Sequence, residues 1–404
     1  MSSNTKKTKI TPSRRLKRSD ASANSQQHSD LQTPVQAVQT LKATLTLTSL
    51  GWGHCFQQQL TLEELEQHKP FRVTEVHRNR IVLQTVAKTE ASTETGENSL
   101  QEQNLSTLFW KGLPSLEKPT VGDWLLLDSD HQPVRLLNRS SLIQRLAAGV
   151  ETTQQLIAAN IDTLLIVTSC NQDFNLNRIE RYLSLAAESG IQPVVVITKS
   201  DLYDEPEHYI EQVRSLDNLL PVESVNATDP ESVQRLQPWC KSGQTLALTG
   251  SSGVGKSTLV NCLVDHIDQA TQGIREDDAK GRHTTTGRSL HLIANGGLLL
   301  DTPGIRELKL FDSESGIRQT FSDIETLSER CRFADCQHQQ EPGCAVRAAI
   351  EAGKLEPRRL NSFNKLMAEQ ERSIQSIAEK REKDRALGRF IKSAQTSAKQ
   401  FRRR

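Results

Sequence analysis

Hydrophobic and polar positions divide the chain into three patterned parts between two polar ends. From about residue 41 to residue 137 the apolar residues form short runs separated by turn residues, which is typical of a small β-barrel. This pattern fits an OB-fold or an SH3-like barrel. The apolar runs of this part are residues 41–47, 71–73, 81–83, 124–127 and 134–136, and residues 89–104 form a polar loop.

From about residue 140 apolar runs alternate with stretches of helical spacing, which predicts a parallel sheet with helices on both faces. After about residue 311 the pattern becomes helical around a group of cysteines, and a helix rich in Lys, Arg and Glu begins near residue 358. The predicted strands of the α/β part are residues 161–167, 194–197, 289–293 and 297–300, and its clearest helix is 176–187.

The two ends of the 404-residue chain are basic, although the formal net charge is only +1. Residues 1–38 contain few large apolar side chains and cannot form a core, which predicts a disordered tail. Residues 1–19 and 385–404 contain lysines and arginines but no acidic residue. Such tails suit a polyanionic partner such as RNA, although basic tails that are merely solvated have the same composition.

Residues 250–258 read G-S-S-G-V-G-K-S-T, between a short apolar run and a helix-like stretch. G-x-x-x-x-G-K-S in this setting is typical of the phosphate-binding P-loop, whose backbone N–H groups surround phosphate oxygens. We expect Lys256 to reach the β- and γ-phosphates of a nucleoside triphosphate and Ser257 to ligate Mg²⁺. The predicted nucleotide-binding residues of this motif are Gly250, Ser251, Ser252, Gly253, Val254, Gly255, Lys256, Ser257 and Thr258.

A second phosphate-site motif, D-T-P-G, begins at Asp301 after an apolar run. An acid at the end of a buried strand suits water-mediated Mg²⁺ binding, and the N–H of Gly304 can sense the γ-phosphate. Between the P-loop and this motif lies G-R-H-T-T-T-G, in the place of a first switch loop. Either Thr284 or Thr285 is expected to cap the γ-phosphate and Mg²⁺.

The residue after the D-T-P-G motif is Ile305, where many GTPases place a glutamine that orients water. An apolar side chain cannot do this, so hydrolysis needs another group. His283 in the switch-like loop is the candidate catalytic residue, and an ordinary surface histidine fits the sequence equally well.

A candidate guanine motif, Thr198-Lys199-Ser200-Asp201, follows the predicted strand at residues 194–197. The Asp201 carboxylate can accept two hydrogen bonds that guanine donates and adenine cannot, while the stem of Lys199 lies along the ring. GTPases usually have N-K-x-D here, and Thr198 replaces the asparagine. The motif therefore favours GTP.

Four metal-ligand residues, Cys331, Cys336, His338 and Cys344, form C-x₄-C-x-H-x₅-C. Three thiolates and one imidazole make a closed tetrahedral set, which indicates one structural zinc ion worth on the order of 10 kcal/mol of folding energy. The seven cysteines are odd in number and no export signal or membrane-spanning run is present, so we expect a reducing, cytoplasmic setting without membrane attachment. Nothing indicates more than a monomer.

The order of the motifs is circularly permuted, because most GTPases place the P-loop before the guanine motif and this chain reverses them. We expect a multidomain protein whose last GTPase motif runs straight into the zinc segment. Its predicted parts are a disordered basic tail (1–38), an OB-fold-like β-barrel (39–138), a circularly permuted α/β P-loop GTPase domain (139–313), a mostly α zinc-binding domain (314–375) and a basic C-terminal helix or tail (376–404).

Together these features resemble the RsgA/YjeQ family of small-ribosomal-subunit biogenesis GTPases. Further matching runs are V-G-D-W from residue 121, Q-L-I-A-A-N-I-D from residue 155 and F-N-L-N-R-I-E-R-Y-L from residue 174. The resemblance is strong over residues 139–366, moderate in the barrel and slight in the tails. Thr198 and the segment 49–67 depart from the family pattern, and the segment 49–67 leaves a diverged paralogue as an alternative to the main family member.

The resemblance implies that the OB-fold and zinc domain grip 16S rRNA, that the 30S subunit stimulates GTP hydrolysis, and that hydrolysis times the release of a late assembly factor. Contacts of this kind are mainly to phosphates and therefore depend on salt. A P-loop kinase or ATPase is a rival that leaves Lys199 and Asp201 without a use. An RNA-binding assembly factor that uses GTP as a conformational clamp, with little hydrolysis, is a second rival that fits Ile305.

Overall fold

The structure is a computed structural model, and it describes residues 46–77, 80–86, 105–110, 118–146, 154–203, 205–264, 288–293, 296–301 and 313–375. Both predicted basic tails, the predicted switch loop and the residues directly after Asp301 lie outside the described residues. The same holds for the predicted polar loop at residues 89–104 and for all but the last two residues of the predicted strand at 41–47.

A helical segment that the sequence pattern did not predict precedes the first strand. It consists of η1 (Thr48–Leu50), α1 (His54–Gln57) and α2 (Leu62–Gln67). Thr61 and Glu64 form a capping box at the start of α2, which explains why a helix begins there. Leu50 and Phe56 are buried in one cluster with Trp124, so this segment covers one face of a later strand.

Five antiparallel strands follow this segment, in the pairing order β3–β2–β1–β4–β5. Four of them contain the predicted apolar runs, whereas β3, which follows the polar loop, was not predicted. Strand β4 is buried on both faces, because Leu125 and Leu127 join a core with Phe71 while Trp124 packs on the helical segment. The strands are β1 (Lys69–Val76), β2 (Ile81–Val86), β3 (Leu105–Trp110), β4 (Trp124–Leu127) and β5 (Pro133–Leu136).

The α/β part contains a sheet in the order β10–β9–β8–β11–β13–β12, in which neighbours pair in parallel up to β13 and β12 is antiparallel. Strand β12 also pairs with β1, which joins the two sheets. The strands are β8 (Thr163–Ser169), β9 (Gln192–Thr198), β10 (Val222–Val225), β11 (Thr245–Thr249), β12 (Arg288–Leu292) and β13 (Leu298–Asp301), and β6 (Leu142–Leu146) and β7 (Gln154–Ala159) form a separate hairpin.

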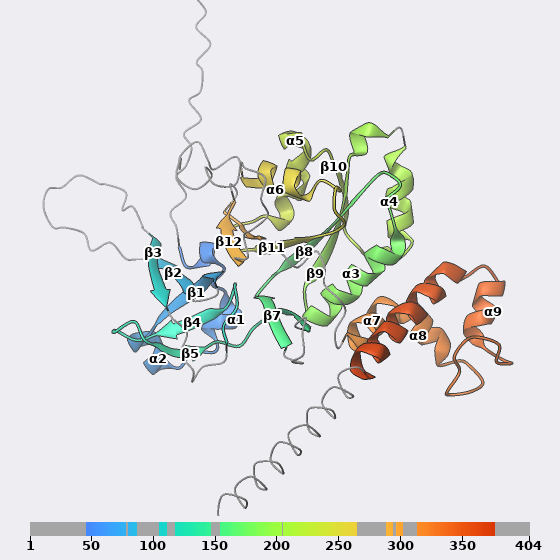
Figure 1. The fold of residues 1–404 in the computed structure, drawn as a ribbon, viewed down its shortest axis with the longest axis horizontal. Coiled ribbons are helices and arrows are strands. Elements are labelled where there is room, and N and C mark those ends of the chain that lie inside the picture. Colours follow the sequence, from blue (N-terminus) through green and yellow to red (C-terminus); the bar gives the residue numbers. More distant parts are fainter. Residues whose placement is uncertain are drawn as a thin grey trace, which may run out of the picture. The chain divides into compact units, whose positions relative to one another are not determined.

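Helices cover both faces of the parallel strands, as the alternating pattern predicts (Figure 1). Successive strand residues point to opposite faces, so Leu164 and Ile166 of β8 join the core beneath α3, whereas Leu165 and Val167 join the core beneath α6. Gly190 ends α3 in the left-handed conformation. The helices are α3 (Leu176–Ser189), α4 (Pro206–Arg214), α5 (Pro230–Val233) and α6 (Lys256–Val264), with η2 (Ser200–Leu202) and η3 (Gln234–Trp239).

The C-terminal part is helical, as predicted, and it packs on α3. Gly316 allows this close approach, because a Cβ atom there would lie 2.2 Å from the carbonyl oxygen of Ser184. A helix over residues 357–375 follows and contributes Phe363 and Leu366 to the same core. The shorter helices are α7 (Glu314–Thr320), α8 (Ser322–Ser328) and α9 (Ala345–Glu351). Among the described residues, no helix is long and apolar enough to cross a membrane.

Candidate nucleotide site and metal centre

Three of the predicted motifs end parallel strands that lie close together in one sheet. Thr198 ends β9, the P-loop follows Thr249 at the end of β11, and Asp301 ends β13. Because β9, β8, β11 and β13 run in parallel, their carboxyl ends lie at the same edge of the sheet. Ligands of open α/β sheets bind at this edge.

The P-loop has the backbone that its glycines predict. Gly250, Gly253 and Gly255 all have positive φ, of 139°, 80° and 93°. Gly250 also lies against β8, where a Cβ atom would come within 2.1 Å of the carbonyl oxygen of Val167. No other residue type fits these positions without strain.

The charged residue of the loop is Lys256, which begins α6 and is 6% exposed. Its Nζ donates to the carbonyl oxygens of Gly250, at 2.7 Å, and Ser251. Val254 is buried and anchors the loop in the core, whereas Ser252, Gly253, Ser257 and Thr258 are exposed at the site. The loop is therefore fixed by two buried side chains, and its exposed residues are accessible to a ligand.

The guanine motif contacts the P-loop directly. Thr198 is fully buried, and its Oγ1 lies 2.5 Å from the carbonyl oxygen of Val254 and 3.0 Å from that of Thr168. Its single hydroxyl proton can serve one of these oxygens at a time. Lys199 has a left-handed backbone with φ 59°, and its Nζ donates to the carbonyl oxygen of Gly253 at 2.9 Å. Thr198, the residue that departs from N-K-x-D, therefore still ties this motif to the P-loop.

The acid of the guanine motif is accessible. Asp201 is exposed and follows Ser200 at the start of η2, so its carboxylate is open to a ligand. The predicted residues Gly304, His283, Thr284 and Thr285 lie outside the described residues.

A pair of residues that the sequence argument missed also lies at the P-loop. Arg178, in the first turn of α3, donates through Nη1 to both carboxylate oxygens of Asp173, at 2.9 and 3.0 Å, and to Oγ of Ser251. Burial raises the pKa of Asp173, but hydrogen bonds from Arg178 and Ser251 and the charges of Arg178 and Lys256 hold it below its usual value. Only the run F-N-L-N-R-I-E pointed to this turn of the chain, and nothing in it indicated contact with the P-loop.

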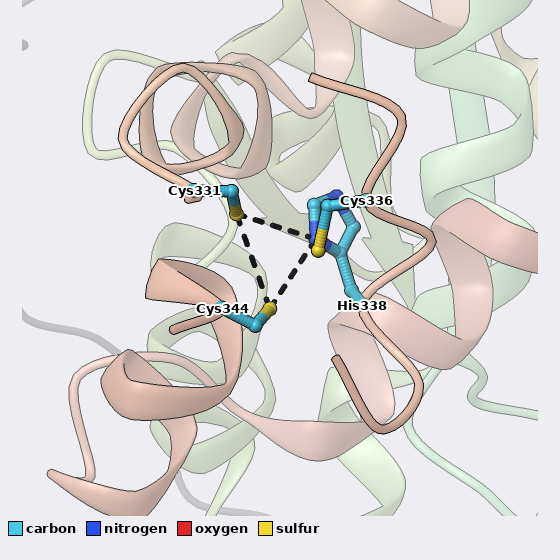
Figure 2. A group of neighbouring side chains, drawn as sticks. All are labelled: Cys331, Cys336, His338 and Cys344. Carbon is cyan, nitrogen blue, oxygen red and sulfur yellow. Dashed lines mark hydrogen bonds between the residues drawn. The ribbon is translucent and has the colours of Figure 1, made fainter. Parts of the chain in front are cut away.

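The four predicted metal ligands meet in one cluster (Figure 2). Their ligand atoms all lie within 4.8 Å of one another. Sγ of Cys331 is 3.9 Å from Sγ of Cys344, and these sulfurs are 3.7 and 3.5 Å from Nδ1 of His338. A tetrahedral zinc site requires S···S and S···N distances of about 3.8 and about 3.6 Å. Cys331, Cys336, His338 and Cys344 therefore fit a zinc ion.

The protonation chemistry of the cluster agrees with metal binding. Burial lowers the pKa of His338, which keeps the imidazole neutral, as a ligand must be. Burial raises the pKa of Cys331, but hydrogen bonds with the N–H groups of Ala345 and Val346 and with Cys336 and Cys344 together outweigh it and favour the thiolate. Burial and the neighbouring thiols raise the pKa of Cys336 to about 11. A cation bound by all of these sulfurs would lower this pKa, because its positive charge stabilises the thiolates.

Known proteins are similar to this chain over most of its length. A family model described as RsgA GTPase matches residues 136–311. The small ribosomal subunit biogenesis GTPase RsgA 2 of Vibrio vulnificus is 50% identical over 357 residues, which make up 88% of this chain and 97% of the relative. The chain belongs to the RsgA GTPase family. This membership confirms the predicted resemblance to the RsgA/YjeQ family and the prediction of a GTPase.

Two solved structures have a similar fold. YjeQ from Thermotoga maritima has a TM-score of 0.53 and 25% identity, and the match covers 75% of this chain and 98% of that one. YloQ, described as a circularly permuted GTPase, has a TM-score of 0.52 and 24% identity, covering 75% of this chain and 94% of that one. The permuted order inferred from the motifs is therefore confirmed.

Proposed function

We propose that this GTPase acts in late maturation of the 30S ribosomal subunit, binds 16S rRNA, and couples GTP hydrolysis to the release of an assembly factor or of itself. The observation that carries the proposal is the Vibrio relative, named a small ribosomal subunit biogenesis GTPase, which this chain matches at 50% identity over 97% of the relative's length. Its name, RsgA 2, also favours the paralogue over the main family member.

In this proposal the P-loop holds the phosphates. Its backbone N–H groups and Lys256 bind the β- and γ-phosphates, and Ser257 ligates the Mg²⁺ ion that neutralises their charge. The buried position of Lys256 supports this role, because its charge is held where phosphate oxygens replace water. Asp301 holds Mg²⁺ through water, and Gly304 senses the γ-phosphate. Thr284 or Thr285 completes the metal site.

Guanine recognition belongs to Lys199 and Asp201. The exposed Asp201 carboxylate accepts the two guanine hydrogen bonds, and adenine would leave it unpaired. His283 remains the candidate for orienting the attacking water, since Ile305 cannot.

The parts of the chain outside the GTPase domain are assigned to RNA binding. We assign residues 39–138 to an OB-fold-like barrel and residues 314–375 to a domain held by one structural zinc, both contacting rRNA together with the basic tails. The five antiparallel strands and the exposed Phe109, over which the Arg80 guanidinium stacks, support a nucleic-acid surface on the barrel. A monomer in the cytoplasm suits this role.

The experiment compares hydrolysis of GTP and ATP by the wild type and by His283→Ala, each with and without purified 30S subunits. Acceleration by 30S on GTP alone supports the proposal, and loss of this acceleration in His283→Ala supports the role of His283. No acceleration by 30S contradicts the choice of partner. GTP binding without hydrolysis under any condition would instead favour the alternative that Ile305 suggests, an RNA-binding assembly factor that uses GTP as a clamp.

A further inference from the structure

A hydrogen bond and several ion pairs connect the P-loop to the helix over residues 357–375 by way of α3. We propose that Arg178 is a positioning residue for the P-loop and that, through it, α3 couples the state of this loop to the attachment of the helix 357–375. The inference rests on the proposal that the loop binds the nucleotide.

The first link lies at the start of α3. Asn175 caps this helix through its side chain, which accepts from the backbone N–H of Arg178 at 3.3 Å. The Arg178 guanidinium then joins Asp173, on the loop after β8, to the hydroxyl of Ser251. Ser251 is the second residue of the P-loop, and its carbonyl oxygen accepts from Lys256. A phosphate that draws Lys256 toward itself must therefore act on Ser251 and on Arg178.

The second link lies less than one turn further along α3. Glu180 is fully buried, and its two carboxylate oxygens accept from Nη1 of Arg358 and Nη1 of Arg359, each at 3.0 Å. The Arg358 guanidinium also donates to Oδ1 of Asn177, the residue next to Arg178, at 2.9 Å. Both arginines begin the helix 357–375, so its first turn is fixed to the same two turns of α3 that carry Arg178.

The third link is an ion pair between Arg181 of α3 and Glu369, on a later turn of the helix 357–375. Between these two helices lies a cleft of about 350 Å³, which Arg178 lines together with Arg181, Lys365 and Glu369. The side chain that holds the P-loop therefore borders the surface on which the C-terminal helix rests.

These contacts can transmit a change because α3 is one continuous helix of 14 residues with a buried charge network at its start. A buried carboxylate keeps its partners, since losing one leaves an uncompensated charge. When nucleotide binding shifts Arg178, the first turns of α3 therefore move, and Arg358 and Arg359 move with them. Linkage is reciprocal, so a partner that holds the C-terminal helix also changes nucleotide affinity.

The test measures the dissociation constant of fluorescent GDP for Arg178→Ala, Arg178→Lys, Ser251→Ala and the Arg178→Ala/Ser251→Ala double variant. We expect each alanine variant to weaken binding by about fivefold and the double variant to be no worse than either, because both remove one interaction. Arg178→Lys keeps the positive charge but not the planar set of guanidinium donors, so we expect its loss of GDP affinity to be intermediate. An unchanged dissociation constant in Arg178→Ala, or additive losses in the double variant, would overturn the proposal.

The coupling itself is read by amide hydrogen exchange in the helix 357–375 with and without GDP. GDP slows this exchange in the wild type, and Arg178→Ala abolishes the slowing; slowing that persists in Arg178→Ala overturns the proposal. The matched control is Arg318→Ala, which breaks ion pairs with Glu314 and Glu325 that do not involve α3, and which leaves both measurements unchanged. A wild type that binds no guanine nucleotide would instead refute the proposed nucleotide site.

Discussion

The nucleotide site and the Cys/His cluster differ in what holds their residues in place. At the nucleotide site the strands β9 and β11 are buried, and the loops that follow them are tied together by Thr198, Lys199 and Lys256. Around the cluster, residues 325–343 include no buried residue, and Leu327, Cys331 and Cys336 are only partly buried against the core. The first site is thus held by the buried sheet, whereas we expect the second to depend more on a bound metal ion for its order.

This difference predicts how the two sites respond to mutation. Removing a ligand of the cluster removes the main force that orders its segment, because little apolar burial remains there. Removing a side chain at the nucleotide site leaves the sheet intact and changes binding alone. Variants in the two regions should therefore differ in their effects on folding and on nucleotide binding.

The largest effect is expected at the metal cluster. Cys331→Ser should release the zinc ion and unfold the segment around it, at a cost that approaches about 10 kcal/mol for the segment. Zinc content by mass spectrometry and proteolysis between residues 325 and 344 measure this, and a chelator should do the same to the wild type. Cys55→Ser, at an exposed cysteine, is the control. Retained zinc in Cys331→Ser would contradict the assignment.

The next effect concerns the charge network that joins α3 to the helix 357–375. Glu180→Gln leaves Arg358 and Arg359 without their buried carboxylate, so we expect a loss of about 3 kcal/mol in the free energy of unfolding. Urea unfolding measures it. Glu351→Gln is the matched control, because Glu351 is exposed and lies 3.8 Å from its arginine. Equal effects of the two variants would show that burial at Glu180 is not decisive.

At the nucleotide site, Lys256→Ala should weaken GTP binding by about 100-fold, close to 3 kcal/mol, because it removes charge-assisted hydrogen bonds to phosphate. The melting temperature without nucleotide and the zinc content should stay near the wild-type values. Calorimetry with GTP measures the binding, with the exposed Lys241→Ala as control. If Lys256→Ala lost zinc as well as GTP binding, the two regions would not respond independently, which would contradict the prediction.

The smallest effect is a change of base preference. Asp201→Asn should weaken GTP by about tenfold and improve xanthosine triphosphate, because an amide can donate to the C2 oxygen of xanthine where the carboxylate repels it. Competition of the two nucleotides against fluorescent GDP measures the preference. If GTP is weakened and xanthosine triphosphate does not improve, Asp201 does not contact the base edge.

Much of both sites could be predicted from local spacing. The P-loop lies between β11 and α6 as the G-x-x-x-x-G-K-S motif indicated, and Cys331, Cys336, His338 and Cys344 do gather. In each case the spacing of a few residues encodes the geometry, through glycines with positive φ or through ligands of matching type. The reversed order of the motifs likewise indicated the permuted sheet, since parallel strands bring their carboxyl ends to one edge.

Contacts between distant segments could not be predicted in this way. Arg72 lies in the predicted run at residues 71–73, yet it is 1% exposed, and its guanidinium donates to the carbonyl oxygens of Leu50 and Asn160 and to the hydroxyl of Thr245. Burial lowers its pKa to about 10. Nothing near Arg72 in the sequence distinguishes it from an arginine that faces solvent.

Local sequence patterns therefore indicated the P-loop, the permuted order of the motifs and the zinc-type ligand set, and they predict a guanine-reading acid at Asp201. Only the folded chain shows which charged residues meet: Arg178 contacts Ser251 of the P-loop, and Glu180 pairs with Arg358 and Arg359. The reason is physical. A motif fixes backbone geometry within a few residues, whereas the environment of a charge depends on every segment packed around it, and only the folded chain brings those segments together.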